Sequence, residues 1–199
     1  MYIKIIILFV FLQTFMNVCG KENNNFMVEN RNDSISLLHS AYVNKDYDTF
    51  FALFPNTFRK FLTYYGYEYD TPAPLYDWAP YHIDYLFSNC LNADRQHINK
   101  LVDIAKEASW DADAPSYLQK HLRDLILHYP VLFLDVLNEK TSEEIENFWL
   151  FILYYPSLHS NNDLQYIKLK EQLYRSMETL NPDMGEVVKK IMIQLGSKE

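Results

Sequence analysis

His121, Asp124 and His128 are the residues whose types and spacing come nearest to a metal site. At positions i, i+3 and i+7 of a helix they share one stripe, and imidazole and carboxylate groups are ligands of divalent metals. The two histidines lie two helical turns apart, however, which is about 10 Å of rise and too far for one ion. They also border an apolar stripe, where a histidine is usually a half-buried, hydrogen-bonded residue. We therefore expect no metal and no other cofactor.

Asp111 and Asp113 form the second candidate, because two carboxylates beside Trp110 could act as acid and base on a sugar. Asp113 is equally well placed to cap a helix with Pro115 in its first turn, and Asp111 could serve the preceding turn in the same way. We prefer the capping interpretation and keep a hydrolase as the less favoured alternative. The chain has 4 glycines, no Gly-x-Ser-x-Gly motif and, in its body, the single cysteine Cys90, so we expect that it is not an enzyme.

The third candidate is the stretch 67–79, the longest one without helical periodicity. It lies within the densest group of aromatic residues in the chain, and tyrosine and tryptophan combine a large contact area with a polar group. We predict that this stretch forms a binding surface. Its predicted residues are Tyr67, Tyr69, Asp70, Tyr76, Asp77 and Trp78. The alternative is a loop that its own aromatic side chains fasten to the helices.

The charge of the chain bears on the kind of partner. The net charge is −8, and no cluster of five basic residues occurs, so nucleic acid is excluded as a partner. The acidic balance either serves solubility alone or favours a basic partner. We expect a protein partner, with a glycan as the alternative.

The first 19 residues predict export. Lys4 and the apolar run Ile5–Leu12 have the layout of a signal peptide, and the run is too short for a permanent membrane span. Met16 to Cys19 is similar to a bacterial lipobox, although Val18 departs from it, and this similarity implies a lipid on Cys19. Ordinary signal-peptidase cleavage after Val18-Cys19-Gly20 is the alternative. We expect residues 20–32 to be a polar tether and the protein to be an outer-membrane or periplasmic lipoprotein, or else soluble in the periplasm or secreted.

Residues 33–199 show helical periodicity throughout. We predict an all-α fold: one compact domain of nine or ten short helices, packed as antiparallel or solenoid-like pairs. Thr57, Asp94 and Thr141 are expected to cap helices, and Gly66 is expected to end one in a left-handed conformation. The helix over 145–155 is apolar on every side and is therefore expected to be central.

Two groups of residues carry a resemblance to a known kind of protein. Phe54-Pro55-x-x-Phe58-x-x-Phe61 and Tyr65-Gly66-Tyr67 precede Trp110-Asp111-Ala112-Asp113-Ala114. Over roughly residues 46–155, the chain resembles small exported helical proteins of Gram-negative bacteria, some of which act as immunity proteins against toxins. The resemblance implies a non-enzymatic cell-envelope protein that binds a protein, or neutralises a toxin, and it assigns no functional residue. A glycan-binding accessory lipoprotein is the alternative.

Overall fold

The computed structural model describes residues 33–68, 70–88, 94–110, 113–154 and 164–196. Cys19, Tyr69, Cys90 and Asp111 lie outside the described residues. The predicted all-α fold is confirmed, with ten α-helices in the described parts of the chain. The chain divides into two compact units, which meet in sequence between Leu53 and Phe54.

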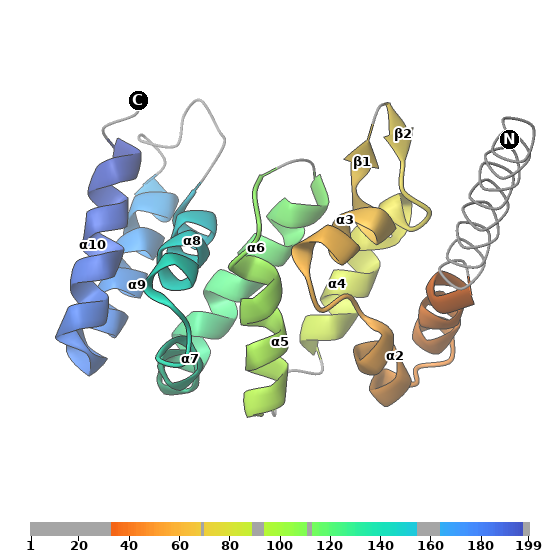
Figure 1. Cartoon of the computed structure of the whole chain (residues 1–199), viewed down its shortest axis with the longest axis horizontal. Coiled ribbons are helices and arrows are strands. Elements are labelled where there is room, and N and C mark those ends of the chain that lie inside the picture. The colour runs from red at the N-terminus through yellow and green to blue at the C-terminus, as the bar shows by residue number, and fades with distance from the viewer. Residues whose placement is uncertain (1–32, 69, 89–93, 111–112, 155–163, 197–199) are drawn as a thin grey trace, which may run out of the picture. The chain divides into compact units, whose positions relative to one another are not determined.

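The first unit contains a helix over 33–43 and helix α2 (Tyr47–Leu53) (Figure 1). The first of these helices ends in a Schellman motif: the amide of Asp46 donates to Ala41 O at 3.0 Å, and that of Lys45 donates to Tyr42 O at 3.1 Å. Lys45 has a φ of 59°, in the left-handed region that glycine usually occupies there. Asp46 then accepts a hydrogen bond from the amide of Thr49 at the start of α2.

The second unit contains the remaining elements (Figure 1). They are α3 (Phe58–Tyr65), β1 (Tyr67–Glu68), β2 (Thr71–Pro72), the 3-10 helix η1 (Tyr76–Trp78), α4 (Ala79–Ser88), α5 (Arg95–Ala105), α6 (Asp113–His128), α7 (Pro130–Leu137), α8 (Ser142–Leu153), α9 (Leu164–Leu180) and α10 (Pro182–Gly196). Helices two places apart in sequence pack together, as α3 does with α5, α4 with α6 and α5 with α7, while α9 and α10 form a hairpin. None of the described helices is long and apolar enough to cross a membrane.

Side chains fix the beginnings of several helices, as predicted. The hydroxyl of Thr57 accepts a hydrogen bond from the amide of Lys60, and the carboxylate of Asp94 accepts one from the amide of His97. Thr141 and Glu144 form a complete capping box at the start of α8.

Gly66 ends α3, but the expected left-handed conformation is wrong. Its φ is −79° and its ψ is −175°, which is extended backbone. Glycine is needed for space instead, because a Cβ atom here would lie 2.7 Å from the carbonyl oxygen of Leu62. The chain therefore leaves α3 directly as strand β1.

The core of the second unit centres on the last two turns of α8. Phe148, Trp149 and Ile152 are fully buried, although the first turn of the same helix is exposed and acidic.

Two polar side chains of α6 are buried beside the end of α8. Gln119 donates hydrogen bonds to the carbonyl oxygens of Phe151 and Tyr154, and Arg123 donates to that of Ile152 at 2.7 Å and to that of Tyr154 at 2.9 Å. These side chains satisfy the carbonyl groups that the end of a helix leaves without partners.

Candidate functional site

The stretch 67–79 is more regular than the sequence suggested. Strands β1 and β2 form an antiparallel hairpin in which Tyr67 pairs with Pro72 and Glu68 with Thr71. Asp70 lies in the turn between them with a φ of 58°, a conformation that aspartate tolerates better than most residues. It is exposed, and it supports the turn rather than lining a pocket. The hairpin is joined to its surroundings by backbone hydrogen bonds, among them one from Leu75 N to Tyr64 O at 2.9 Å.

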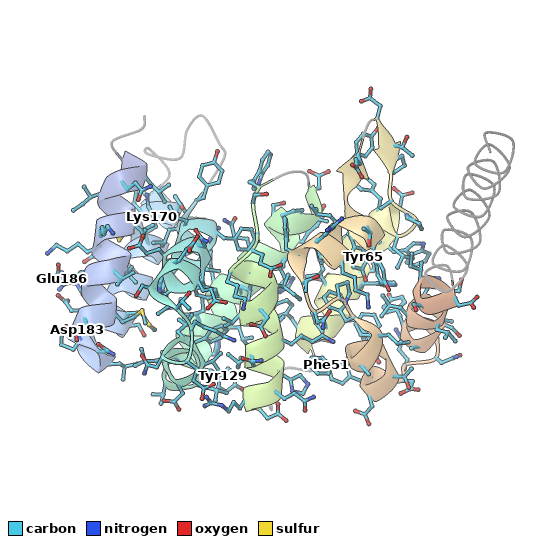
Figure 2. The ribbon with its side chains drawn as sticks, in the orientation of Figure 1. Phe51, Tyr65, Tyr129, Lys170, Asp183 and Glu186 are labelled. Atoms are coloured by element: carbon cyan, nitrogen blue, oxygen red, sulfur yellow. The ribbon has the colours of Figure 1, made fainter. Side chains whose placement is uncertain are left out.

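Helix η1 continues directly into α4, which begins at Ala79. The inner side of this junction is buried: Leu75 and His82 are covered, and the hydroxyl of Tyr65 lies 3.0 Å from Nδ1 of His82. Tyr65 is labelled in Figure 2. Burial, with a smaller effect of Tyr64, raises the pKa of Tyr65 well above its usual value, so this hydroxyl stays neutral.

The outer side of the same segment exposes large aromatic side chains. Tyr67, Trp78 and Tyr81 are 43%, 40% and 56% exposed. The ring of Tyr67 meets that of Tyr76 edge to face at 5.4 Å, and the rings of Trp78 and Tyr81 lie 5.8 Å apart. One side of the segment therefore packs against the helices, and its other side exposes aromatic rings.

Asp113 joins this surface from α6. Its Oδ2 accepts a hydrogen bond of 3.1 Å from the hydroxyl of Tyr76, and this bond raises the pKa of Tyr76 above its usual value. Between the two elements lies a pocket of about 190 Å³. Its lining residues are Tyr76, Asp77, Ala79, Pro80, Asp113, Ala114 and Tyr117. The aromatic stretch and the aspartate of the second sequence candidate therefore belong to one site.

We call the residues Tyr67, Tyr76, Asp77, Trp78, Tyr81, Asp113 and Tyr117 the η1 surface. Sequence analysis missed Tyr81 and Tyr117. Tyr81 follows Asp77 by four residues, and Tyr117 follows Asp113 by four residues. This spacing places side chains on the same side of a helix. This four-residue spacing could have predicted both tyrosines.

Both histidines of the predicted stripe form other contacts. Nε2 of His121 lies 2.7 Å from Oδ1 of Asp84, and the ring of His121 stacks on Phe87. His128 donates from Nδ1 to the carbonyl oxygen of Asp124 at 2.8 Å, one turn back in its own helix. The described residues hold no group of three side chains suited to a metal ion.

A second, wider depression of about 350 Å³ lies between α9 and α10. It is lined by Glu171, Tyr174, Lys189, Met192 and Ile193. The lining combines the opposite charges of Glu171 and Lys189 with apolar side chains, so it favours no particular ligand.

Comparisons of the chain with protein-family models, with curated proteins and with solved structures found no match. A function must therefore be inferred from the geometry of the η1 surface.

Proposed function

We propose that the protein is a non-catalytic cell-envelope protein that binds another protein through the η1 surface. The observation that carries the proposal is the exposure of Tyr67, Trp78 and Tyr81 on a segment whose inner side is firmly buried. Exposed aromatic side chains on a fixed support are typical of the residues that dominate protein interfaces, because they bury much area and lose little side-chain entropy.

The charge of the chain supports a basic partner. The net charge is −8, and the η1 surface itself carries Asp77 and Asp113. Complementary charge speeds association and selects against acidic proteins. A small acidic protein that covers the working face of a basic toxin would act in this way, so neutralisation of a toxin is the activity that we propose for it.

Export and lipidation at Cys19 complete the proposal. A protein with several acyl chains would stay at the membrane, whereas one chain would anchor it weakly. The variant Cys19→Ala is expected to move the protein from the membrane fraction to the soluble one. Mass spectrometry of a mature protein that starts at Lys21 without lipid would contradict the lipid anchor and leave export intact.

The binding proposal is tested by photo-crosslinking in cells that naturally make the protein. A photoreactive amino acid replaces Tyr81 in one variant and Val131 of α7 in a control, since both side chains are 56% exposed. We expect one protein of defined mass to be linked at position 81 and not at position 131. Equal products at both positions, or none at position 81, would contradict a partner at the η1 surface.

Glycan binding is the second candidate, because the pocket places Tyr76 and Tyr117 beside two carboxylates that could accept hydrogen bonds from sugar hydroxyls. A glycan array separates the two candidates. Saturable binding of a glycan that Tyr117→Ala abolishes, with no protein linked at position 81, would favour the glycan.

A further inference from the structure

The pocket between η1 and α6 has the composition of a site for a cation. It is lined by Ala79 and Ala114, which are almost completely buried, and by the aromatic residues Tyr76 and Tyr117. The faces of tyrosine rings attract cations within about 6 Å of the ring centre. The pocket therefore offers apolar and aromatic residues to a positively charged group.

The two carboxylates of the pocket have no basic partner among the residues that the structure describes. Among the described residues, no lysine, arginine or histidine forms an ion pair with Asp77 or Asp113. Asp103 and Glu144, by contrast, are each bound by a lysine. Asp113 uses Oδ2 to accept the hydrogen bond from Tyr76, so its other carboxylate oxygen can face a second donor.

The size of the pocket favours one side chain over a whole small molecule. Its volume of about 190 Å³ is below the range of about 300–1,000 Å³ that is usual for pockets that bind drug-sized ligands. A flat guanidinium group stacks on aromatic rings and donates paired hydrogen bonds to carboxylates. An ammonium group also donates hydrogen bonds to carboxylates, but with less specific geometry.

We infer that this pocket takes the guanidinium group of an arginine side chain, supplied by the protein that binds the η1 surface. Asp77 and Asp113 accept its hydrogen bonds, and Tyr76 and Tyr117 flank its plane. The exposed rings of Tyr67 and Trp78 then contact the partner around this residue. The inference rests on the proposed function and adds to it the chemistry of the central contact.

The test uses small probes and the whole protein. N-acetyl-arginine amide is titrated into isotope-labelled protein while the backbone amide signals are followed by NMR, and N-acetyl-citrulline amide, its neutral analogue of nearly the same shape, is titrated in parallel. We expect arginine amide to give saturable shifts centred on residues 76–80 and 113–117. Citrulline amide should give no saturable shift, and N-acetyl-lysine amide should bind more weakly than arginine amide.

Variants distinguish binding in the pocket from a general effect of the protein's negative charge. Asp77→Asn should weaken the binding of arginine amide about two- to fivefold, as loss of one exposed ion pair does. Asp113→Asn should do the same without unfolding α6, because asparagine has nearly the same shape as aspartate and still accepts a hydrogen bond from Tyr76. Asp183→Asn, which removes an exposed carboxylate from α10 (Figure 2), is the control and should leave the binding unchanged.

Equal binding of citrulline amide, shifts centred outside the pocket, or an unchanged affinity in Asp77→Asn would each overturn the inference. The crosslinking experiment reports independently on the proposed function. A protein linked at position 81 together with no binding of arginine amide would remove the arginine pocket and keep the binding surface. Binding of arginine amide without a linked protein would keep the arginine pocket and remove the proposed protein-binding surface.

Discussion

The hydroxyl of Tyr76 donates a hydrogen bond to Oδ2 of Asp113 across 3.1 Å, although 37 positions separate the two residues in sequence. Asp113 is the first residue of α6, where a negative charge also interacts favourably with the positive end of the helix dipole. This contact connects the aromatic stretch to α6 and closes one side of the pocket. It gives Asp113 a role beyond starting its helix.

The titration of Tyr76 tests this contact. The bond to Asp113 raises the pKa of Tyr76 above 10.0, because the carboxylate accepts from the neutral hydroxyl and repels the phenolate. Its contribution to stability is therefore complete below about pH 10 and is lost as the pH rises through the raised pKa. We expect Asp113→Ala, which removes the acceptor, to lower the pKa of Tyr76, measured by NMR of labelled tyrosine rings, with Tyr76→Phe to assign the signal. An unchanged pKa would show that the bond does not persist in solution.

Arg123 is expected to contribute more to stability than an exposed arginine. Its guanidinium group is buried, and it donates to the carbonyl oxygens of Ile152 and Tyr154 at the end of α8. Arg123→Ala removes the arginine donor from the carbonyl oxygen of Ile152 and leaves that of Tyr154 with Gln119 alone, so it should lower the free energy of unfolding by about 2–4 kcal/mol. Arg175→Ala, which removes an exposed arginine from α9, is the control and should leave the denaturant midpoint nearly unchanged. Similar midpoints for the two variants would show that water replaces the guanidinium group.

Trp149 tests whether α8 is central. Its side chain is fully buried, and Nε1 donates to the sulfur atom of Met184 at 3.3 Å. Trp149→Ala should lower the free energy of unfolding by about 3–5 kcal/mol, as large truncations in a packed core do. Trp110→Ala is the matched control, because that tryptophan is 42% exposed. An equal, small effect of both changes would place α8 at the edge of the core.

The fold class and several helix ends could be predicted because they depend on residues close together in sequence. Thr57 and Asp94 each cap a helix through an amide three residues away, so the signal lies within one turn. The hairpin was missed because β1 and β2 have two residues each, too few to show an alternating pattern, and β2 includes Pro72.

The site could be predicted only in part, because its assembly depends on contacts between distant segments. Tyr67, Tyr76, Asp77 and Trp78 were predicted from composition, and the structure places all four in the η1 surface. Nothing in the sequence pairs Tyr76 with Asp113, since that contact follows from the packing of α4 against α6. Arg123 was missed for a similar reason. A charged residue beside an apolar stripe normally faces water, and here it is buried because the end of another helix supplies acceptors.

Glu144 gives the protein a distinct response to acid. Its hydrogen bond with Lys106, together with hydrogen bonds from Thr141, lowers the pKa of Glu144 from 4.5 to about 2. The resulting stabilisation is present above pH 4.5 and is lost as the pH falls from 4.5 towards 2. We expect Glu144→Gln to flatten the dependence of the denaturant midpoint on pH in this range. The neighbouring change Glu143→Gln should leave that dependence as it is, and a steep acid limb in Glu144→Gln would contradict the prediction.

Lys45 tests the turn between the first two described helices. Its φ of 59° strains a side chain with a Cβ atom, and its ammonium group lies 4.5 Å from the ring centre of Tyr42. Lys45→Gly and Lys45→Ala both remove the contact with Tyr42, so the difference between them isolates the backbone. Relief of strain favours glycine by about 1–2 kcal/mol, and the greater freedom of glycine in the unfolded chain offsets about 0.5–1 kcal/mol of it. Lys45→Gly should therefore be more stable than Lys45→Ala by about 0.5–1 kcal/mol in urea unfolding. If the alanine variant is the more stable one, the Schellman motif at the end of the first helix does not form in solution.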